Sequence, residues 1–399
     1  MHAHVKPAPA DAARPAAPVA LVHFALAMGG FAIGTTEFAT MSLLPYFAKG
    51  LHIDEPTAGH VISAYALGVV VGAPLLAVAA AKLSRRTLLI ALMTMFALFN
   101  GLSALAPTYH WMLLFRFFSG LPHGAYFGIA ALVAASLVPT NQRSQAVGRV
   151  MLGLTVATIL GVPLANWLGQ AVGWRWGFGV VALLALLTVL LVALFAPRDK
   201  PEAGVSPLTE LSALANKRVW LTLGIGAIGF GGLFCVYTYL ASTLLAVTGT
   251  SAAALPLVLA IFGVGMTIGN LVAPRFADRA LMPTAAALLA GSAIALALYP
   301  FAAPHFWSIC LDVFAIGFSG ALGTVLQTRL MDVAGKAQAL AAALNHSAFN
   351  TANALGPWLG GIAIAAGYGW TSTGWVGALL ALGGLGVLGL AVLDDRRIA

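Results

Sequence analysis

Long apolar runs separated by short polar segments divide this sequence, and that division constrains the fold more than any other feature. The stretches 181–196 and 374–393 contain no charged residue, and a helix needs about 20 apolar residues to cross a bilayer. Only 8% of all residues are charged and 60% are hydrophobic, far from the balance of a water-soluble domain. We therefore expect an all-α membrane protein.

The apolar runs predict twelve transmembrane helices in two pseudo-symmetric six-helix bundles. The predicted spans are 20–44, 58–81, 87–105, 110–135, 146–171, 177–196, 219–246, 252–274, 282–301, 306–326, 338–365 and 374–393. The predicted domains are a tail (1–18), an N-terminal bundle (19–196), a linker (197–218), a C-terminal bundle (219–393) and a second tail (394–399). The first run is too long for a signal-peptide core and lacks a cleavage site, so we expect it to remain attached.

The distribution of Lys and Arg predicts the orientation, because cationic loops resist translocation. With the N-terminus in the cytoplasm, only Lys49 and Arg175 face outward, and Arg116 is the one basic residue within a span. The cytoplasmic side then receives Lys6, Arg14, Lys82, Arg85, Arg86, Arg143, Arg149, Arg198, Lys200, Lys217, Arg218, Arg275, Arg279, Arg329, Lys336, Arg396 and Arg397. This asymmetry predicts an even number of spans, both termini in the cytoplasm and a cytoplasmic linker.

The two halves share a pattern of small residues. Gly68 and Gly72 precede Ala81-Lys82 as Gly265 and Gly269 precede Asp278-Arg279, 197 residues further along (265 − 68). Small residues also recur at spacing four in the fifth span (Gly153, Ala157, Gly161, Ala165, Gly169) and in the eleventh (Ala348, Ala352, Gly356, Gly360), with Pro163 and Pro357 placed alike. Such stripes allow close helix packing in lipid. Their repetition indicates an internal duplication, as in carriers whose halves move about a central site.

The composition excludes several other classes. The formal charge of +8 comes from small groups scattered between apolar runs rather than one basic face, so nucleic acid is not an expected partner. Cys235 and Cys310 lie in apolar runs without metal-ligand spacing, so we expect neither disulfide nor metal. The glycine-rich tract 224–232 has no phosphate-loop pattern, and no other nucleotide motif is present. We therefore expect no cofactor, with an ion gradient as the energy source.

Three ionisable residues, Glu37, Arg116 and Asp312, lie well inside predicted spans. A charge there costs roughly 2.5 to 3.5 kcal/mol on insertion scales, so such residues are functional candidates. All three are expected at similar depth in the outer half, because they lie six or seven residues from outer helix ends. Glu37 is our candidate for proton coupling, with Arg116 and Asp312. The alternative is that a carboxylate pairs with Arg116 only to stabilise the bundle.

Aromatic and amide side chains within the spans are candidates for a cavity of mixed character. The expected cavity residues are Phe31, Tyr126, Phe127, Phe230, Phe234, Tyr237, Phe314, Phe318, Asn345, His346 and Asn350, with Asn166 and Gln170 also considered. The histidines His23, His123 and His346 could carry protons, although a buried histidine is more often simply hydrogen-bonded in place.

Several motifs resemble those of the major facilitator superfamily. The segment from Gly72 to Arg86 resembles its loop 2-3 signature, and Arg116 with Gly120 resembles its fourth-span motif. More narrowly, the sequence is similar to twelve-span drug/proton antiporters of the arabinose-efflux-permease-like branch, through Gly34-Thr35-Thr36-Glu37-Phe38, Ala58-Gly59-His60, Tyr65-Ala66-Leu67-Gly68 and Ser119-Gly120-Leu121-Pro122-His123-Gly124. The segment from Gly153 to Pro163 resembles the antiporter motif, whose shape Gly356-Pro357 with Gly360-Gly361 repeats.

The resemblance implies a proton-coupled exporter of sugars or drugs in the bacterial inner membrane, working as a monomer. It also implies conformational gating by Arg85, Arg86, Gly153, Gly161, Pro163, Asp278, Arg279, Gly356 and Pro357. One departure matters: the signature usually has an acidic residue where this chain has Ala81. A latch built from Asp and Arg would therefore depend on Asp278 and Arg279 in the second half.

Two other functions are compatible with parts of this sequence. The same architecture supports uptake, by proton symport or by facilitation, because gradients decide the direction. The segment Gly317-Phe318-Ser319-Gly320, with His346 as base, also matches the GxSG of rhomboid-like intramembrane proteases. We reject the protease, because a four-residue pattern arises easily in a chain with 44 glycines and the paired halves would have no role in it. The substrate remains open between a sugar, a nucleoside and an amphiphilic drug such as chloramphenicol.

Overall fold

The computed structural model describes residues 18–79, 83–139, 143–198, 212–334 and 338–398, and this part of the chain is almost entirely helical. The first half contains α1 (Val19–Ser42), α2 (Leu44–Leu51), α3 (Glu55–Ala79), α4 (Arg85–Leu105), α5 (Tyr109–Ser136), α6 (Arg143–Val156), η3 (Ala157–Gly161), α7 (Val162–Ala171) and α8 (Trp174–Phe195). Residues 1–17 of the predicted N-terminal tail, Ala81, Lys82, Lys336 and most of the linker lie outside the described residues.

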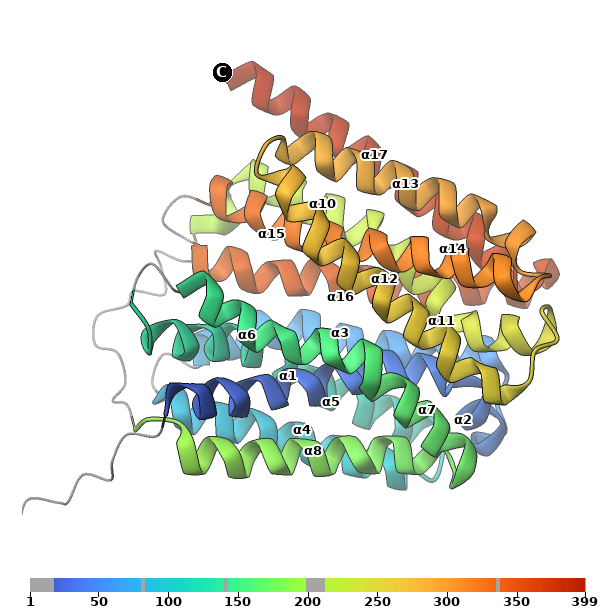
Figure 1. Cartoon of the computed structure of the whole chain (residues 1–399), viewed down its shortest axis with the longest axis horizontal. Coiled ribbons are helices and arrows are strands. Elements are labelled where there is room, and N and C mark those ends of the chain that lie inside the picture. Colours follow the sequence, from blue (N-terminus) through green and yellow to red (C-terminus); the bar gives the residue numbers. More distant parts are fainter. Residues whose placement is uncertain (1–17, 80–82, 140–142, 199–211, 335–337, 399) are drawn as a thin grey trace, which may run out of the picture.

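The second half repeats this arrangement (Figure 1). It contains η4 (Ser212–Ala215), α10 (Lys217–Gly229), α11 (Gly231–Ala246), η5 (Ala252–Ala254), α12 (Leu255–Ala277), α13 (Leu281–Ala302), α14 (Phe306–Phe318), η6 (Ser319–Ala321), α15 (Leu322–Val333), α16 (Gln338–Ala363), η7 (Ile364–Tyr368) and α17 (Ser372–Ile398). The tenth crossing, α14 to α15, continues seven residues beyond the predicted end at 326.

Eleven helical segments of the described chain are long and apolar enough to cross a membrane. The 26-residue α16 makes the twelfth crossing, and its polar side chains are explained by its place in the interior beside α3 and α11. Large apolar side chains such as Leu75, Leu183 and Leu379 are more than half exposed on the outer surface. So much exposed apolar surface fits lipid and not water. The predicted fold class, twelve transmembrane helices in two bundles, is confirmed.

Both described chain ends lie at one end of the bundle, on the left in Figure 1. We call it the basic end, because the helix termini there carry Arg85, Arg86, Lys217, Arg218 and Arg329. Lys49 and Arg175 lie at the other end, which we call the opposite end.

Identical backbone contacts show that the halves are repeats. Gly68 and Gly72 of α3 face the carbonyl oxygens of Phe117 and Leu121 on α5, where a Cβ atom would not fit. In the second half Gly265 and Gly269 of α12 face the carbonyl oxygens of Phe314 and Phe318 in the same way. All four positions are displaced by the same 197 residues. The internal duplication indicated by the sequence therefore holds in three dimensions.

The two small-residue stripes pack against the first crossing of their own half. Gly153 and Gly161 contact α1, and Gly356 contacts the carbonyl oxygen of Gly231 at the start of α11. The prolines differ in setting: Pro163 follows the π-helical turn η3, whereas α16 remains α-helical through Pro357.

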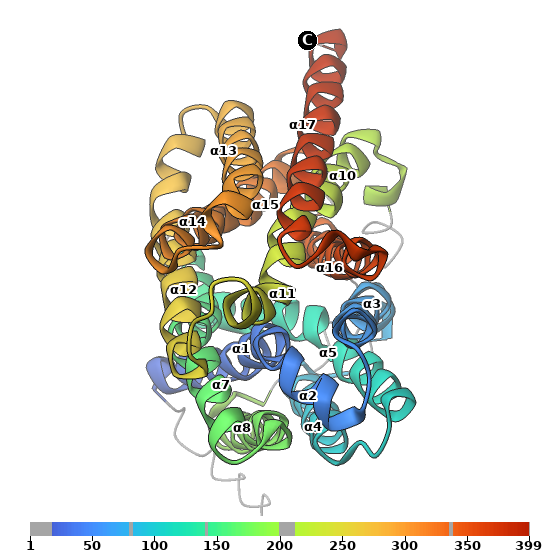
Figure 2. The same cartoon turned by 90° about the vertical axis from the view of Figure 1, so that its right-hand side faces the viewer.

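The halves meet mainly along α3 with α16, α1 with α11, and α7 with α12, as Figure 2 shows in a view from the opposite end. Towards that end, Ser242 donates to Glu55, and Gln170 Nε2 donates to the carbonyl oxygen of Ala252 at 2.9 Å. Nearer the centre, Ser63 Oγ donates to the carbonyl oxygen of Ala354 at 2.8 Å. These three hydrogen bonds join the halves near the centre and towards the opposite end.

Candidate functional site

Arg116 of α5 is buried inside the N-terminal half, with 1% of its surface exposed. Its Nη1 donates to Thr36 Oγ1 at 3.1 Å, Asn100 Oδ1 at 3.3 Å and Ser119 Oγ at 3.5 Å. The guanidinium carbon lies 4.2 Å from the centre of the Tyr65 ring. No described carboxylate lies within ion-pair distance, so hydroxyl, amide and aromatic groups hold this cation.

Glu37 of α1 follows Thr36 directly and is 8% exposed. Its Oε1 accepts a hydrogen bond of 3.2 Å from Asn353 Nδ2 on α16. This is the fourth side-chain hydrogen bond between the halves in the described part of the chain. Of these four, it alone involves a carboxyl group that lies well inside a membrane-spanning helix. Glu37 and Arg116 therefore share an environment without forming an ion pair.

A polar chain leads from Arg116 back to Glu37. Tyr65, which stacks on Arg116, has its hydroxyl 2.9 Å from His123 Nδ1. The His123 ring lies 6.1 Å from the ring of His346 on α16, and His346 stacks on Phe127 at 5.4 Å.

Two amide side chains of α16 connect His346 to Glu37. Asn350 Nδ2 donates to the carbonyl oxygen of His346 at 3.0 Å, and Asn353 Nδ2 lies 3.5 Å from Asn350 Oδ1. We call this set the polar ring: Thr36, Glu37, Arg116, Tyr65, His123, His346, Asn350 and Asn353. It crosses from one half to the other twice, at Glu37 with Asn353 and at His123 with His346.

Aromatic side chains fill the space beside Glu37. Phe38 projects from α1 toward the second half, with ring centres 5.4 Å from Tyr237, 6.1 Å from Phe262 and 6.2 Å from Phe234. Phe230 lies 5.8 Å from Phe234 and 4.5 Å from Phe349. We call these six residues the aromatic cluster: Phe38, Phe230, Phe234, Tyr237, Phe262 and Phe349. The polar ring and the aromatic cluster meet at adjacent residues of α1, Glu37 and Phe38.

Asp312 of α14 lies apart from the polar ring, inside the C-terminal half. It is 8% exposed, and its Oδ2 has no hydrogen-bond partner among the described residues. The Tyr299 hydroxyl lies within electrostatic range of Asp312. The structure thus brings Glu37 and Arg116 together but places Asp312 elsewhere, so the alternative in which it pairs with Arg116 has no support.

Several expected cavity residues lie elsewhere. The Tyr126 hydroxyl donates to the carbonyl oxygen of Leu26 at 2.8 Å, within the first half, and Phe31 packs against Gly161. The backbones of Phe314 and Phe318 serve the glycine contacts of α12, and Asn345 is buried on α16. Phe230, Phe234 and Tyr237 do gather in the aromatic cluster, and Phe127, His346 and Asn350 lie at the polar ring.

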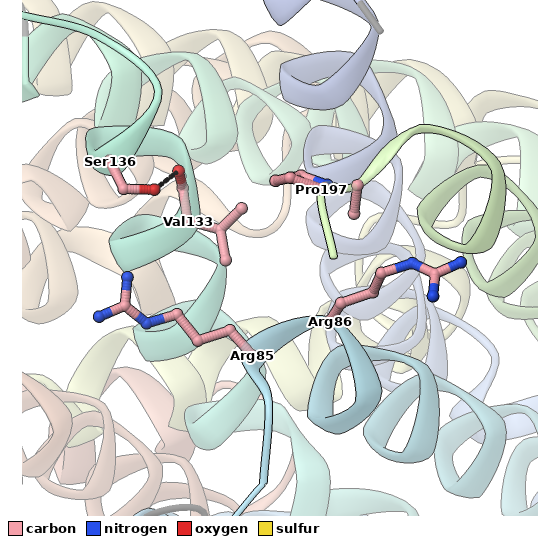
Figure 3. A pocket seen from close by; sticks show the side chains of 6 residues that line it. Arg85, Arg86, Val133, Ser136 and Pro197 are labelled. Carbon is pink, nitrogen blue, oxygen red and sulfur yellow. Dashed lines mark hydrogen bonds between the residues drawn. The ribbon is translucent and has the colours of Figure 1, made fainter. Parts of the chain in front are cut away.

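The expected gating arginines line a small hollow at the basic end, of about 40 Å³, together with Val133, Ser136, Ala196 and Pro197. Figure 3 shows the guanidinium groups of Arg85 and Arg86 pointing away from each other. Arg86 donates to the carbonyl oxygen of Ala193 on α8. The hollow has room for one or a few water molecules rather than a substrate.

The expected latch residues Asp278 and Arg279 are exposed and form no ion pair with another described residue. Ion pairs at the basic end instead connect α17 with α10 and α15. Lys217 lies 2.6 Å from Asp394, and Arg218 and Arg329 lie 3.4 and 2.5 Å from Asp395. These pairs fasten the last helix within the second half.

Ser319 and His346, the pair that the protease alternative requires, have other partners in the structure. Ser319 Oγ donates to the carbonyl oxygen of Ile316 at 2.6 Å and lies 3.4 Å from Ser292 Oγ, while His346 packs on Phe127. Within the described ranges no three His, Cys, Asp or Glu side chains cluster to hold a metal.

Asn100, Asn353, Phe38 and Phe262 are site residues that reasoning from the sequence missed. A signal was available for the two asparagines, because each lies inside a predicted apolar span, where a buried amide needs partners. The aromatic pair carried no such signal, since most phenylalanines in this chain face lipid or neighbouring helices.

Two six-helix repeats that enclose a polar ring within a membrane-spanning bundle define a transporter and not an enzyme. A family model described as Major Facilitator Superfamily matches residues 26–302 and 225–398. The chain therefore belongs to the major facilitator superfamily.

Known proteins resemble it over nearly its whole length. It is 40% identical to the "Inner membrane transport protein YdhP" of Escherichia coli (strain K12), covering 94% of this chain and 95% of that one. It is 32% identical to a "Chloramphenicol resistance protein" of Streptomyces lividans, covering 84% and 86%. The crystal structure of a mutant of the nucleoside transporter NupG superimposes with a TM-score of 0.76 at 16% identity, covering 94% and 100%, which shows a shared fold.

Proposed function

We propose that this protein is a secondary active efflux transporter that exchanges protons for a small organic substrate by alternating access. One observation carries the proposal: the Glu37 carboxyl, buried in the first half, is hydrogen-bonded to Asn353 of the second half. A proton bound or released at Glu37 therefore acts directly on a contact between the halves. Arg116 supplies a positive charge within electrostatic range of Glu37.

We place the basic end in the cytoplasm, because cationic loops resist translocation. The hydrogen bonds described between the halves lie near the centre and towards the opposite end, and we interpret this arrangement as a state closed to the outside. In the proposed cycle a proton enters Glu37 from outside and leaves to the cytoplasm, and the substrate moves the other way. The inner membrane of a bacterium is the expected location, and Asp312 is a second candidate for carrying a proton.

An amphipathic substrate suits the site best. The aromatic cluster offers ring faces for an apolar or aromatic portion, and the polar ring offers amide, imidazole and carboxyl groups beside it. Chloramphenicol has this character, and the name of the Streptomyces relative supports drug export. A sugar or nucleoside remains an alternative substrate, and uptake by symport remains an alternative direction.

Proton release by the purified protein tests the proposal. Chloramphenicol, L-arabinose and uridine are each added to the protein in weakly buffered detergent solution with a pH indicator. We expect release of protons with at least one probe, and loss of that release in Glu37→Gln but not in Asp312→Asn. Release that survives in Glu37→Gln would transfer the coupling role to Asp312 or a histidine. Binding without release in the wild type would favour a facilitator.

A further inference from the structure

Asn353 occupies an unusual position in the polar ring. Its side chain is fully buried, its Nδ2 lies 3.2 Å from Glu37 Oε1 and 3.5 Å from Asn350 Oδ1, and its own Oδ1 has no hydrogen-bond partner among the described residues. A buried amide oxygen without a partner is rare in folded proteins and calls for an explanation. The amide thus has one end engaged and the other end available.

The chemistry of the two groups supplies the explanation. An ionised carboxylate only accepts hydrogen bonds, whereas a protonated carboxyl also donates one. An asparagine amide has a donating end and an accepting end, so it can satisfy either form of Glu37 by turning about its last side-chain bond. The present orientation, with Nδ2 toward Glu37, suits the carboxylate. The free Oδ1 would suit the acid.

We propose that Asn353 couples the protonation of Glu37 to the contact between the halves, by turning its amide when Glu37 gains a proton. The turn replaces the bond from Nδ2 with a bond from the carboxyl O–H to Oδ1, and it removes Nδ2 from Asn350. Asn353 is a positioning residue in this scheme, since it carries no proton itself. The inference rests on the proposed function, namely that Glu37 exchanges a proton during transport.

The local backbone of α16 can respond to that turn. Residue 357 is a proline and lacks an N–H, so the carbonyl oxygen of Asn353 has no partner four residues later in the helix. The next residue, Ala354, accepts the hydrogen bond from Ser63 of α3 at 2.8 Å. Two consecutive residues of α16, at a point where the helix is weakened, therefore hold α1 and α3 of the first half.

Other groups around Glu37 set the background for a pH response. Among the described residues, the charged or titratable side chains within electrostatic range of Glu37 are Arg116 of α5 and Tyr65 of α3. Tyr65 also contacts His123, whose ring faces His346 on α16. A pH response that depends on Asn353 is therefore separable from one through the histidines, because the latter would survive replacement of the amide.

Spin-label distances between the halves test the inference without any substrate. Cys235 and Cys310 are replaced by Ala, and labels are placed at Thr108→Cys and His305→Cys, two exposed positions in loops at the opposite end. Distances are measured by double electron–electron resonance from about pH 5 to about pH 9, a range that covers buried carboxyls. The variants are Asn353→Leu, Asn353→Gln, Glu37→Gln and, as a matched control, Thr351→Val on the exposed face of the same helix.

In the wild type we expect two distance populations whose ratio changes with pH, and no change in Glu37→Gln. In Asn353→Leu the pH-driven change in that ratio should shrink by about tenfold or more, as for loss of a hydrogen bond to a charged group. Asn353→Gln keeps both ends of the amide and should retain most of the response, and Thr351→Val should match the wild type.

A response in Asn353→Leu equal to that of the wild type would overturn the inference and leave the proposed function intact. A wild type that does not respond to pH, or a Glu37→Gln variant that still does, would instead contradict the proposed function. If Asn353→Leu is not monodisperse after purification, Asn353→Ser serves in its place, because its hydroxyl is too short to reach Glu37 and the same outcomes apply.

Discussion

The two halves have the same backbone contacts, but equivalent interior positions carry side chains of different chemistry. Gly120 faces the carbonyl oxygen of Tyr65, and Gly317 faces that of Phe262, 197 residues further along in both cases. Tyr65 belongs to the polar ring, whereas Phe262 belongs to the aromatic cluster. At the same displacement Arg116 corresponds to Val313, which is buried among apolar side chains.

This difference suggests a division of labour between repeats. Glycines at helix contacts are fixed by geometry, because any Cβ atom there would collide with backbone. Side chains that point into each bundle are free to differ. In this chain the first half contributes Glu37, Arg116 and Tyr65 to the polar ring, and the second half supplies most of the aromatic cluster.

Replacement of the buried charge of Arg116 should have the largest effect on transport. Arg116→Leu, which makes the first half resemble the second at this position, should lower transport by about 100-fold or more, because the hydroxyl and amide acceptors around the guanidinium lose their donor. Val313→Leu should change transport by less than about threefold, as for a volume change of one methylene. Both are measured as chloramphenicol transport in everted membrane vesicles. Similar losses in the two variants would contradict the division.

The shared contacts predict equal effects in the two halves. Gly68→Ala and Gly265→Ala each place a Cβ atom against a backbone carbonyl, and each should lower stability by about 1 to 3 kcal/mol. Thermal unfolding of the purified variants, followed by tryptophan fluorescence, provides the measurement. Gly128→Ala, where a Cβ atom meets nothing within 4 Å, is the control. A strongly unequal result would show that the repeats are not equivalent at their closest contacts.

The equivalent residues Tyr65 and Phe262 should affect different properties, namely the pH dependence of proton release and the affinity for substrate. Tyr65→Phe removes the hydrogen bond to His123, and we expect substrate-evoked proton release to change its dependence on pH while substrate affinity stays within about threefold, a loss of about 1 kcal/mol. Phe262→Leu should instead weaken binding by about tenfold and leave the pH dependence unchanged, because it removes aromatic contacts. Titration with chloramphenicol distinguishes the two, and exchanged phenotypes would refute the assignment.

A smaller difference lies at the opposite end. Asp54 precedes α3, and its Oδ1 accepts a hydrogen bond from the Thr57 amide at 2.8 Å, whereas the corresponding Ser251 makes no such bond before η5. Asp54→Ala should cost about 1 kcal/mol or less, and Ser251→Ala close to nothing. Thermal unfolding at neutral pH measures the stability of both variants. A larger loss of stability in Ser251→Ala than in Asp54→Ala would contradict this prediction.

The Asp54 effect should also depend on pH. The hydrogen bonds from Thr57 lower the pKa of the Asp54 carboxyl below its usual value. A lowered pKa means that the contribution is present above the unfolded-state pKa and is lost as the pH falls through the folded-state pKa. The difference in unfolding temperature between wild type and Asp54→Ala should therefore shrink in acid.

The fold could be predicted from the sequence because its signals are local. Charge-free runs mark the spans, and the glycines at a displacement of 197 mark the repeat, so the twelve crossings and the internal duplication followed without coordinates. The site was only partly predictable. Glu37 and Arg116 stood out as charges in apolar runs, and the structure brings them into one network.

The site residues that the sequence did not reveal are those whose role depends on which helix faces meet across the interface between the halves. Nothing local distinguishes Asn353, which contacts Glu37, from Asn345, which does not. Phe38 and Phe31 lie two turns apart on α1, yet Phe38 enters the aromatic cluster and Phe31 packs on Gly161. Such differences depend on helix rotation within a bundle, which one sequence does not fix.

The small number of bonds between the halves has an energetic consequence. Four side-chain hydrogen bonds cross the interface among the described residues, and each contributes only about 1 kcal/mol net. One elementary charge moving through a membrane potential gains about 2.3 kcal/mol per 100 mV. The work available from one ion is therefore of the same order as the hydrogen bonding between the halves, so the proposed exchange of a single proton per cycle is a thermodynamically adequate drive.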